Sequence, residues 1–527
     1  MNTPMPELPT ITENERTPLV DVLLEVSAWK DQRIDELEQE ILKLKGETLK
    51  PKIFPSKMDK EDSATDNASS KNATKPERSS KTKSLKIDET VVIEPENIPV
   101  GAKFKGYREV VIQDIIFKTH NTCYRLKQYQ CPDGHYVSGE MPKEFAGCHY
   151  GKELISYILY QYHHQHVTQP LLLAQLRDIG VEISSGRLSE FITENLDVFH
   201  DEKDEILKVG LSVSAYIHAD DTGARHDGKT GYCTHIGNEL FAWFSSTEAK
   251  SRVNFLSLLN KGIGANYVLN EGAFEYMARQ KLPQLVQEQI LNNSHTLNDK
   301  THWESWLDEL KIIKPTHRKT VTEAALLGGL FAQGIRANLG IMSDDAGQFN
   351  VFDHALCWIH AERVINRLIP LNPNQAIAVE EIRKLIWEIY RDLKAYKLNP
   401  LATQADSIRQ RFKELCHTKT CYATMNEALK RMGKNEHELL RVLDKPYLPL
   451  HNNLSERDIR EYVKKRKISG STRSESGRRC RDTFASLKKT CRKHGVSFWH
   501  YLKARLLNDQ SIQPLSVFIR NAAVTCG

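Results

Sequence analysis

Two apolar segments of this chain end in paired aspartates, and this pattern constrains the fold more than any other feature. The first segment, "LSVSAYIHADD", alternates apolar and polar residues from Leu211 to Asp220, as a half-buried strand does. The second segment, "LGIMSDD", runs into Asp344 and Asp345. Helical patterns lie around both segments, so the sequence predicts an α/β unit in this region.

The alternation also separates the two acids of the first pair. Successive residues of a strand point to opposite faces, so Asp220 shares a face with His218 and Tyr216, whereas Asp221 falls on the core side. Asp220 is therefore the better candidate for chemistry. His218 either supports Asp220 from the same face or fills a polar pocket.

A third acid, Glu456, stands at the entry to a helix in "HNNLSERDIREYVKKRK". Two strand-end aspartates and a helical glutamate are hard oxygen ligands of the kind that hold two Mg²⁺ ions for phosphodiester chemistry. Strand-end aspartates also cap helices, and the helix dipole favours a glutamate in a first turn. Spacing alone therefore leaves a catalytic and a structural reading open.

The segment after Glu456 is strongly basic. Between Arg457 and Arg505 there are 16 Lys and Arg against 4 Asp and Glu, although the whole chain of 527 residues has a net charge of only +5. Such a block indicates a polyanion partner, with DNA phosphates the first candidate, and a solvated helix face is the alternative. The bases expected to contact DNA are Arg457, Arg460, Lys464, Lys465, Arg466, Lys467, Arg478, Arg479 and Arg481.

Composition and periodicity divide the chain into domains. Residues 1–55 are expected to form an amphipathic, coiled-coil-like helix, 56–90 a disordered linker, and 91–147 a small β-rich domain. Residues 148–206 have a helix-turn-helix outline with a turn near Gly180, which is typical of DNA-binding domains and also of ordinary helical packing. The catalytic α/β core is expected over 207–508, with insertions near 260–335 and 372–450, followed by a tail at 509–527.

Within that core, "GYCTHIGNELFAWFSST" predicts two strands joined near Gly237 and Asn238. The segment "LGIMSDDAGQFNVFDHALCWIHAERVINRLI" predicts a strand, a loop and then a helix.

The ten cysteines include no CxxC pair. Both "CPDGH", with Cys131 and His135, and "CWIH", with Cys357 and His360, offer fewer ligands than the four of a structural zinc site, so no zinc is expected. Cys357 and His360 are expected to support packing instead. No apolar stretch approaches the roughly 20 residues of a membrane span, and the start lacks a secretory pattern, so a cytoplasmic location without membrane contact is expected.

Four short segments of the chain resemble segments of the transposases of the insertion sequence sixty-six (IS66) family. They are "HADDTG", "SDDAGQF", "CWIHAER" and the stretch from "HNNLSERDIREYVKKRK" to "SLKKTC". The corresponding family patterns are Asp-Glu-Thr, Asp-Gly-Tyr, Cys-Trp-x-His, and Asn-Asn-x-x-Glu-Arg before a basic run. The chain departs from the family in four ways. It has Asp221 in place of glutamate, His451 where an aspartate often precedes Asn-Asn, and Glu362 where an arginine usually follows Cys-Trp-x-His-Ala. It also lacks the cysteine pairs of the family's zinc module.

The resemblance implies a ribonuclease H-like core, a mixed sheet flanked by helices, with an Asp-Asp-Glu triad at Asp220, Asp344 and Glu456 that binds Mg²⁺. It implies a DNA transposase that acts as a homo-oligomer on the terminal inverted repeats of an insertion sequence and on target DNA. Water would attack first, and the freed 3′-hydroxyl would then attack the target. Small accessory proteins of the mobile element and a location on the bacterial nucleoid are further expectations. The alternatives are a DNA-binding descendant without catalysis and a nuclease without strand transfer.

Overall fold

The structure is a computed structural model that describes residues 86–99, 101–142, 149–261, 267–293, 297 and 299–526. The chain divides into two compact units, residues 1–118 and 119–527. The described part of the first unit contains neither helix nor strand. The helix expected over 1–55 and nearly all of the linker expected over 56–90 lie outside the described residues.

The second unit begins with a short antiparallel hairpin. Strand β1 (Gln128–Gln130) pairs with β2 (Tyr136–Ser138) across a turn in which Gly134 has a φ of +88°. Only glycine adopts such a backbone angle without steric cost. Among the described residues of the β-rich segment expected over 91–147, this hairpin is the regular secondary structure.

A helical subdomain follows the hairpin. It consists of α2 (Lys152–Leu159), the π-helix η4 (Tyr160–His164), α3 (Gln169–Asp178) and α4 (Ser185–Thr193). Gly180, with a φ of +83°, lies in the turn after α3, and the Ser184 hydroxyl caps α4 by accepting from the Arg187 amide at 3.1 Å. The helix pair and its turn are confirmed as secondary structure. They enclose an apolar cluster of Ile158, Leu172, Leu176, Ile183, Leu188 and Ile192.

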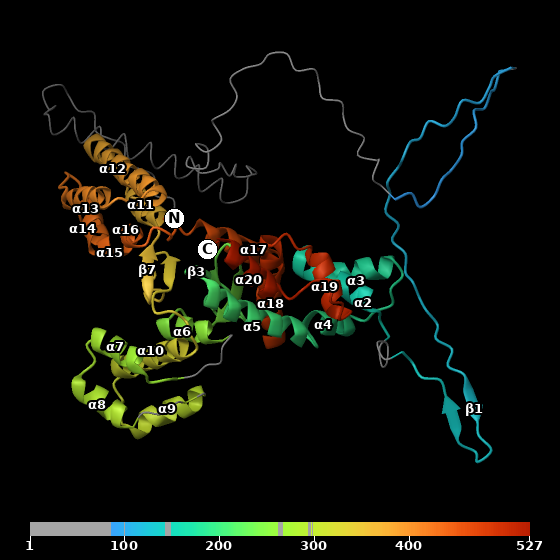
Figure 1. The fold of residues 1–527 in the computed structure, drawn as a ribbon, viewed down its shortest axis with the longest axis horizontal. Helices are drawn as coiled ribbons and strands as arrows, with labels where there is room; N and C mark the ends of the chain where they lie inside the picture. The colour runs from blue at the N-terminus through green and yellow to red at the C-terminus, as the bar shows by residue number, and fades with distance from the viewer. Residues whose placement is uncertain are drawn as a thin grey trace, which may run out of the picture. The chain divides into compact units, whose positions relative to one another are not determined.

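Five strands form one mixed sheet in the order β5–β4–β3–β6–β7. Figure 1 labels β3 and β7 of this sheet. Strand β3 is antiparallel to β4, which is antiparallel to β5, whereas β3, β6 and β7 run parallel. The two strands predicted around Gly237 are confirmed as β4 and β5, and β7 is a strand that the sequence did not predict. The bounds are β3 Tyr216–Gly223, β4 Tyr232–Gly237, β5 Ala242–Thr247, β6 Gly340–Ser343 and β7 Asp353–Leu356.

The predicted start of β3 is wrong. Residues 211–213 belong to helix α5 (Asp197–Val213), and the strand begins only at Tyr216. Gly210 lets this helix approach the sheet region closely, because an added Cβ there would lie 2.6 Å from the Phe241 ring. The strand runs on to Gly223 because β4 pairs with it along that whole length. A short alternating pattern does not distinguish the last turn of a buried helix from a strand.

Helices cover both faces of the sheet. The face that carries Ile217, Ala219 and Trp243 packs into the main core with α5, α6 (Arg252–Asn260) and α10 (Pro315–Ala332). On the opposite face, Ile459 and Tyr462 of α17 (Asn453–Ser469) pack against β4 and β5. The face of β3 that carries Asp220 therefore lies beneath α17.

Helix α18 (Glu475–Lys493) protects the free edge of β5. The backbone amides of alternate β5 residues donate to one side chain from each of three successive helical turns: Ala242 to Thr490 Oγ1 at 3.2 Å, Phe244 to Ser486 Oγ at 2.9 Å and Ser246 to Asp482 Oδ2 at 2.7 Å. An uncovered edge would present unpaired amides to other chains. Part of the basic segment is thus a structural element of the core.

Two groups of helices lie where the insertions were expected. Helices α7 (Glu271–Arg279), α8 (Gln284–Asn292) and α9 (Lys300–Glu309) lie between α6 and α10 in the sequence. The second group lies between α11 (Trp358–Asn366) and α17. It comprises α12 Pro373–Leu398, α13 Ala402–His417, α14 Ala423–Lys434, α15 Glu436–Leu439 and α16 Arg441–Asp444.

The segment expected as a tail forms a helix on the core. After α19 (Phe498–Leu506), α20 (Leu515–Cys526) packs against α5, with Leu515 and Ile519 fully buried. The Leu515 amide donates to Glu202 Oε1 at 2.8 Å. None of the described helices is long and apolar enough to cross a membrane.

Candidate active site

The structure brings Asp220, Asp344 and Glu456 to one side of the central sheet. Asp220 lies within β3, and Asp344 follows β6, the parallel neighbour of β3. The pairing of His218 with Met342, continued by two residues, places Asp344 beside Asp220. Glu456 lies in the first turn of α17, which crosses β3. Three elements far apart in sequence thus contribute one acid each.

The acids act on one another electrostatically. Burial, together with the negative charges of Asp344, Asp221 and Glu456, raises the pKa of Asp220 to about 7, although the Asp221 amide opposes this by donating to Asp220 Oδ1 at 2.7 Å. A buried carboxylate whose ionised form is disfavoured by neighbouring carboxylates suits a hard divalent cation. The three residues present therefore fit Mg²⁺ by the chemistry of their donors.

The oxygens of the three acids are not all within 4.8 Å of one another, so in this conformation they form no cage for a single ion. Within the described part of the chain, one group of three ligands does meet that spacing: Cys131, Asp133 and His135 in the β1–β2 turn. Asp133 and His135 are exposed there. With three ligands, this group lacks the fourth that structural zinc sites have.

Helix α11 holds the carboxylate of Glu456. Arg363 Nη1 lies 3.3 Å and His360 Nε2 3.5 Å from Glu456 Oε1. Burial lowers the pKa of His360, and the Glu456 carboxylate opposes that shift. His360 therefore lies beside a candidate catalytic acid, in a supporting position. Arg363, three residues further along the same helix, was not anticipated from the sequence.

Asn452, the residue before α17, connects the helix to the strand of Asp220. Its side chain is buried, its Nδ2 donates to the Ala219 carbonyl at 3.0 Å, and its Oδ1 lies 2.8 Å from His218 Nδ1. Its backbone amide donates to Cys357 Sγ at 3.2 Å. His218 and Cys357 thus both contact Asn452. The sequence analysis did not single out Asn452 as a site residue. Its position could have been predicted from the sequence, because asparagine is a common residue before the first turn of a helix and Asn452 precedes Glu456 by four residues.

The second acid of each pair has a different environment. Asp221 accepts hydrogen bonds from Thr234 Oγ1 at 2.5 Å and Gln348 Nε2 at 2.8 Å. Asp345 is exposed and forms an ion pair with Arg431. Hydrogen bonds thus hold Asp221 and an ion pair holds Asp345 away from the other acids, so Asp220 and Asp344 are the members of each pair that lie on the side of Glu456.

Polar contacts fix α17 on the sheet behind the acids. His235, which pairs with Asp220 in the sheet, lies 2.6 Å from Ser455 Oγ through Nδ1 and 3.3 Å from Asp458 through Nε2. Burial alone would raise the pKa of Asp458, but the contacts with His235 and Lys493 hold that pKa well below its usual range. Asp458 remains ionised and ties the helix to β4.

The basic residues predicted to contact DNA fall into three groups. Arg466 and Arg478 are half-buried, the first bonded to the Gly223 carbonyl and the second paired with Glu475 at 2.7 Å. Lys465 and Arg481 are buried. The exposed members are Arg457, Arg460, Lys464, Lys467 and Arg479.

A cavity of about 280 Å³ lies beside the acids. Asp344, His360 and Arg363 line it, together with Arg431 and Asn435 from the second helical insertion. Glu362, where the family pattern has arginine, turns away from these residues and pairs with Arg383 at 2.7 Å.

Comparisons with known proteins identify the family of this chain. The sequence model of the family described as "Transposase IS66 family" matches residues 315–479, which include Asp344 and Glu456 but not Asp220. An uncharacterized protein, y4jO, of Sinorhizobium fredii (strain NBRC 101917 / NGR234) is 42% identical over 318 residues, which are 60% of this chain and 99% of that protein. On these matches, together with the acids that β3, β6 and α17 bring together, the chain belongs to the IS66 family of transposases.

Proposed function

We propose that this protein is a DNA transposase that binds the terminal inverted repeats of an insertion sequence and catalyses metal-dependent strand cleavage and strand transfer. The observation that carries the proposal is the convergence of Asp220, Asp344 and Glu456 from β3, β6 and α17, with charges that act on one another. Such a site fits a protein of a transposase family, because transposition requires phosphodiester displacement and paired divalent ions promote that reaction.

The fold supports a ribonuclease H-like core. Its central sheet is mixed, helices cover both faces, and two of the three acids lie on adjacent parallel strands. Fold alone does not determine function, so the proposal rests on the acids and on family membership.

Each acid has a distinct role in the proposed reaction. Asp220 and Asp344 would hold one side of the metal site from the sheet, and Glu456 would complete it from α17. Bound Mg²⁺ would neutralise these carboxylates, activate the attacking oxygen and stabilise the leaving oxygen. Arg363 and His360 restrict the Glu456 carboxylate, and Asn452 keeps the start of α17 on β3.

The surface of α17 offers a path for the DNA backbone. Arg457, Arg460, Lys464 and Lys467 are all exposed, and their spacing of three, four and three residues places them on one face of the helix. This basic stripe starts next to Glu456 and extends roughly 15 Å along the helix axis. Phosphates bound along it would lead the strand to the acids.

The test uses purified full-length protein and labelled DNA that carries the ends of its element. Cleavage and joining are measured with and without Mg²⁺ for the wild type, for Asp344→Asn and for the matched control Asp345→Asn. We expect Mg²⁺-dependent cleavage and joining by the wild type and the control, and DNA binding without cleavage by Asp344→Asn.

The other outcomes identify the alternatives. Cleavage without joined product would assign the protein to the nucleases without strand transfer. DNA binding by the wild type without any cleavage, also in the presence of the element's other proteins, would assign it to DNA-binding descendants. Equal activity of Asp344→Asn and the wild type would show that Asp344 is not a catalytic residue.

A further inference from the structure

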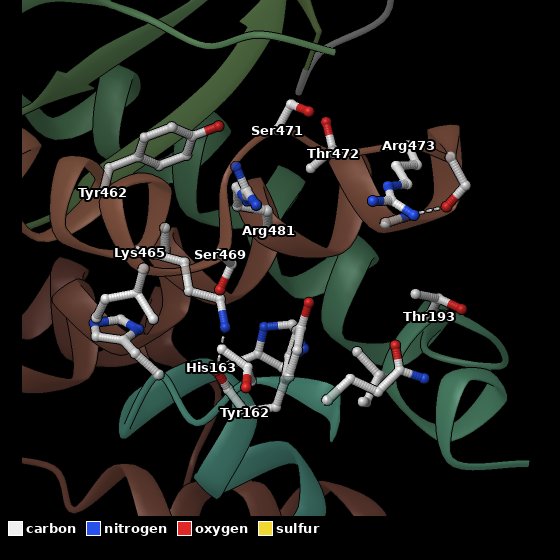
Figure 2. A pocket seen from close by; sticks show the side chains of 18 of the residues that line it. Tyr162, His163, Thr193, Tyr462, Lys465, Ser469, Ser471, Thr472, Arg473 and Arg481 are labelled. Carbon is white, nitrogen blue, oxygen red and sulfur yellow. Dashed lines mark hydrogen bonds between the residues drawn. The ribbon is translucent and has the colours of Figure 1, made fainter. Parts of the chain in front are cut away.

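A second cavity, of about 640 Å³, lies between the helical subdomain and the basic helices (Figure 2). Its walls come from η4, α3 and α4 on one side and from α17, α18 and the loop between them on the other. Its lining differs from that of the acidic site. It contains the cations Lys465, Arg473, Arg481 and Lys488 and a single carboxylate, that of Glu461.

Two of these cations are buried without a carboxylate partner. Lys465 is 6% exposed; its ammonium donates to the Tyr162 carbonyl at 2.8 Å and lies 3.6 Å from the centre of the Tyr162 ring. Arg481 is 9% exposed and donates to the Gly470 carbonyl at 3.1 Å. Neither forms an ion pair with an acid in the described ranges. By contrast, Lys488 pairs with Glu461 at 3.1 Å.

A buried cation without a counter-charge is costly. Burial, together with the positive charges of Arg481 and Lys488, lowers the pKa of Lys465 to about 7. Removal of such a group from water is offset only by a nearby opposite charge or by strong hydrogen bonds. The cavity therefore has a positive charge that an anion would neutralise.

Uncharged polar groups in the same cavity also lack partners. Among the described residues, neither His163 Nε2 nor Ser469 Oγ has a hydrogen-bond partner, and His163 is only 6% exposed. Both residues lie around the cavity with Lys465 and Arg481, as Figure 2 shows. Buried polar atoms are rarely left unsatisfied unless a ligand or water completes them.

The N-terminus of α18 opens into the same space. Ser474 caps this helix of 19 residues, and Ser474, Gly477 and the preceding Arg473 all line the cavity. The Gly477 amide already donates to the Ser474 hydroxyl at 3.1 Å, so this end of the helix contributes its partial positive charge, which attracts anions.

We propose that this cavity is a binding site for a phosphate group. Phosphate offers several acceptor oxygens for the ammonium of Lys465, the guanidinium of Arg481 and the Ser469 hydroxyl. Its source is either the backbone of bound DNA or a free phosphate or nucleotide. The DNA source rests on the proposed function. Lys465 lies nine residues from Glu456, roughly 14 Å along α17, which corresponds to about four nucleotide steps of a DNA strand.

The first experiment titrates full-length protein with inorganic phosphate in phosphate-free buffer and follows binding by calorimetry. The variants are Lys465→Met and the matched control Lys208→Met, an exposed lysine of α5 that does not line the cavity. We expect saturable binding to the wild type and the control, and at least about tenfold weaker binding to Lys465→Met, because one charge-assisted contact is lost. Absence of saturable binding by the wild type, or equal binding by Lys465→Met, overturns the proposal.

The thermal stability of the free protein separates a binding role from a structural one. If Lys465 is retained for an anion, its replacement by methionine leaves the melting temperature of the phosphate-free protein equal or higher, because an unpaired buried charge is removed. If Lys465→Met does not fold, Ser469→Ala takes its place. Phosphate affinity of Ser469→Ala equal to that of the wild type then overturns the proposal.

The second experiment identifies the source of the phosphate. Phosphate is titrated into protein saturated with repeat-end DNA. If bound DNA abolishes phosphate binding, the cavity binds a phosphate of the DNA backbone. If phosphate still binds, the cavity binds a free anion, and a titration with deoxynucleoside monophosphates then tests whether that anion is a nucleotide. A protein that binds phosphate but neither binds nor cleaves DNA contradicts the proposed function and leaves the phosphate site intact.

Discussion

The side-chain amide of Asn452 donates to the carbonyl of Ala219 at 3.0 Å, one residue before Asp220. The same side chain contacts His218 at 2.8 Å, and Asn452 is the cap residue of α17, whose first turn carries Glu456. A single buried residue thus sets the strand that carries one candidate acid against the helix that carries another.

Asn452→Ala is expected to destabilise the protein by about 2–4 kcal/mol, because it leaves the His218 ring and the Ala219 carbonyl buried without their partner. The decrease in melting temperature, measured by differential scanning calorimetry, checks this. Asn453→Ala, a change at the adjacent, partly exposed position, is the control. Similar melting temperatures for both variants would show that Asn452 does not hold the two elements together.

The acidic site is expected to make stability depend on pH and Mg²⁺. The pKa of Asp220 is about 7 in the folded protein against an ordinary 3.8. Below pH 4 the group is neutral in both states; as pH rises toward 7 the unfolded chain releases its proton first, so the free energy of unfolding falls. The loss is at most about 4 kcal/mol, at about 1.4 kcal/mol per pKa unit.

Mg²⁺ is therefore expected to raise the melting temperature more at pH 8 than at pH 5, because it favours the ionised carboxylates. Asp220→Asn should raise the melting temperature of the metal-free protein at pH 8 and reduce the Mg²⁺ effect. Asp345→Asn serves as the control, since its carboxylate is exposed and paired with Arg431. The same Mg²⁺ effect in Asp220→Asn and the wild type would contradict a metal site at Asp220.

The exposed basic stripe of α17 is expected to determine the salt dependence of DNA binding. The double change Lys464→Gln and Lys467→Gln should weaken binding and reduce the slope of log K against log salt by about 2, since each lost phosphate contact retains about one counterion. Binding measured by fluorescence anisotropy at several salt concentrations gives this slope. Lys489→Gln is the control, because this buried lysine pairs with Asp458 at 3.5 Å inside the protein. An unchanged slope in the double variant would show that Lys464 and Lys467 do not contact DNA phosphates.

Asp482 is expected to be important for the sheet although it lies within the basic segment. Its carboxylate accepts from the Ser246 amide at 2.7 Å and from the Tyr462 hydroxyl at 3.0 Å. Asp482→Ala should cost about 3–5 kcal/mol, because both donors become unsatisfied, and should promote aggregation through the uncovered β5 edge. Melting temperature and light scattering test this against Glu475→Ala, a change at an exposed position of the same helix. Equal behaviour of both variants would show that α18 does not protect the strand.

The sequence alone indicated which residues belong to the candidate site, but it did not indicate how those residues contact one another. Alternation in β3 singled out Asp220 from Asp221, because side-chain direction in a strand follows from the backbone alone. Asp344 after an apolar strand and Glu456 at a helix start also followed from the sequence, the family resemblance assigned the three acids to one triad, and in the structure they lie on one side of the sheet. By contrast, no local pattern predicted that Arg363 would reach Glu456, since that contact depends on the approach of α11 to α17.

The basic segment shows the same division. Its charge count predicted a polyanion partner, but burial determines which bases are available, and burial depends on tertiary packing. Lys464 and Lys465 are adjacent in the sequence, yet one is exposed and the other lies in a cavity beneath the helical subdomain.

By itself, then, the sequence determined the α/β character of the core, the candidate acids and the family of the protein, because these depend on residue type and local periodicity. Tertiary structure alone decided where β3 begins, that β7 exists, and that α18 covers the edge of β5. It also decided that two buried cations share a cavity without a counter-charge. The cover of β5 and the placing of Lys465 follow from contacts between segments more than 200 residues apart, such as Ala242 with Thr490 and Lys465 with Tyr162. The β6–β7 pair spans only 13 residues, but it too depends on packing that no local pattern contains.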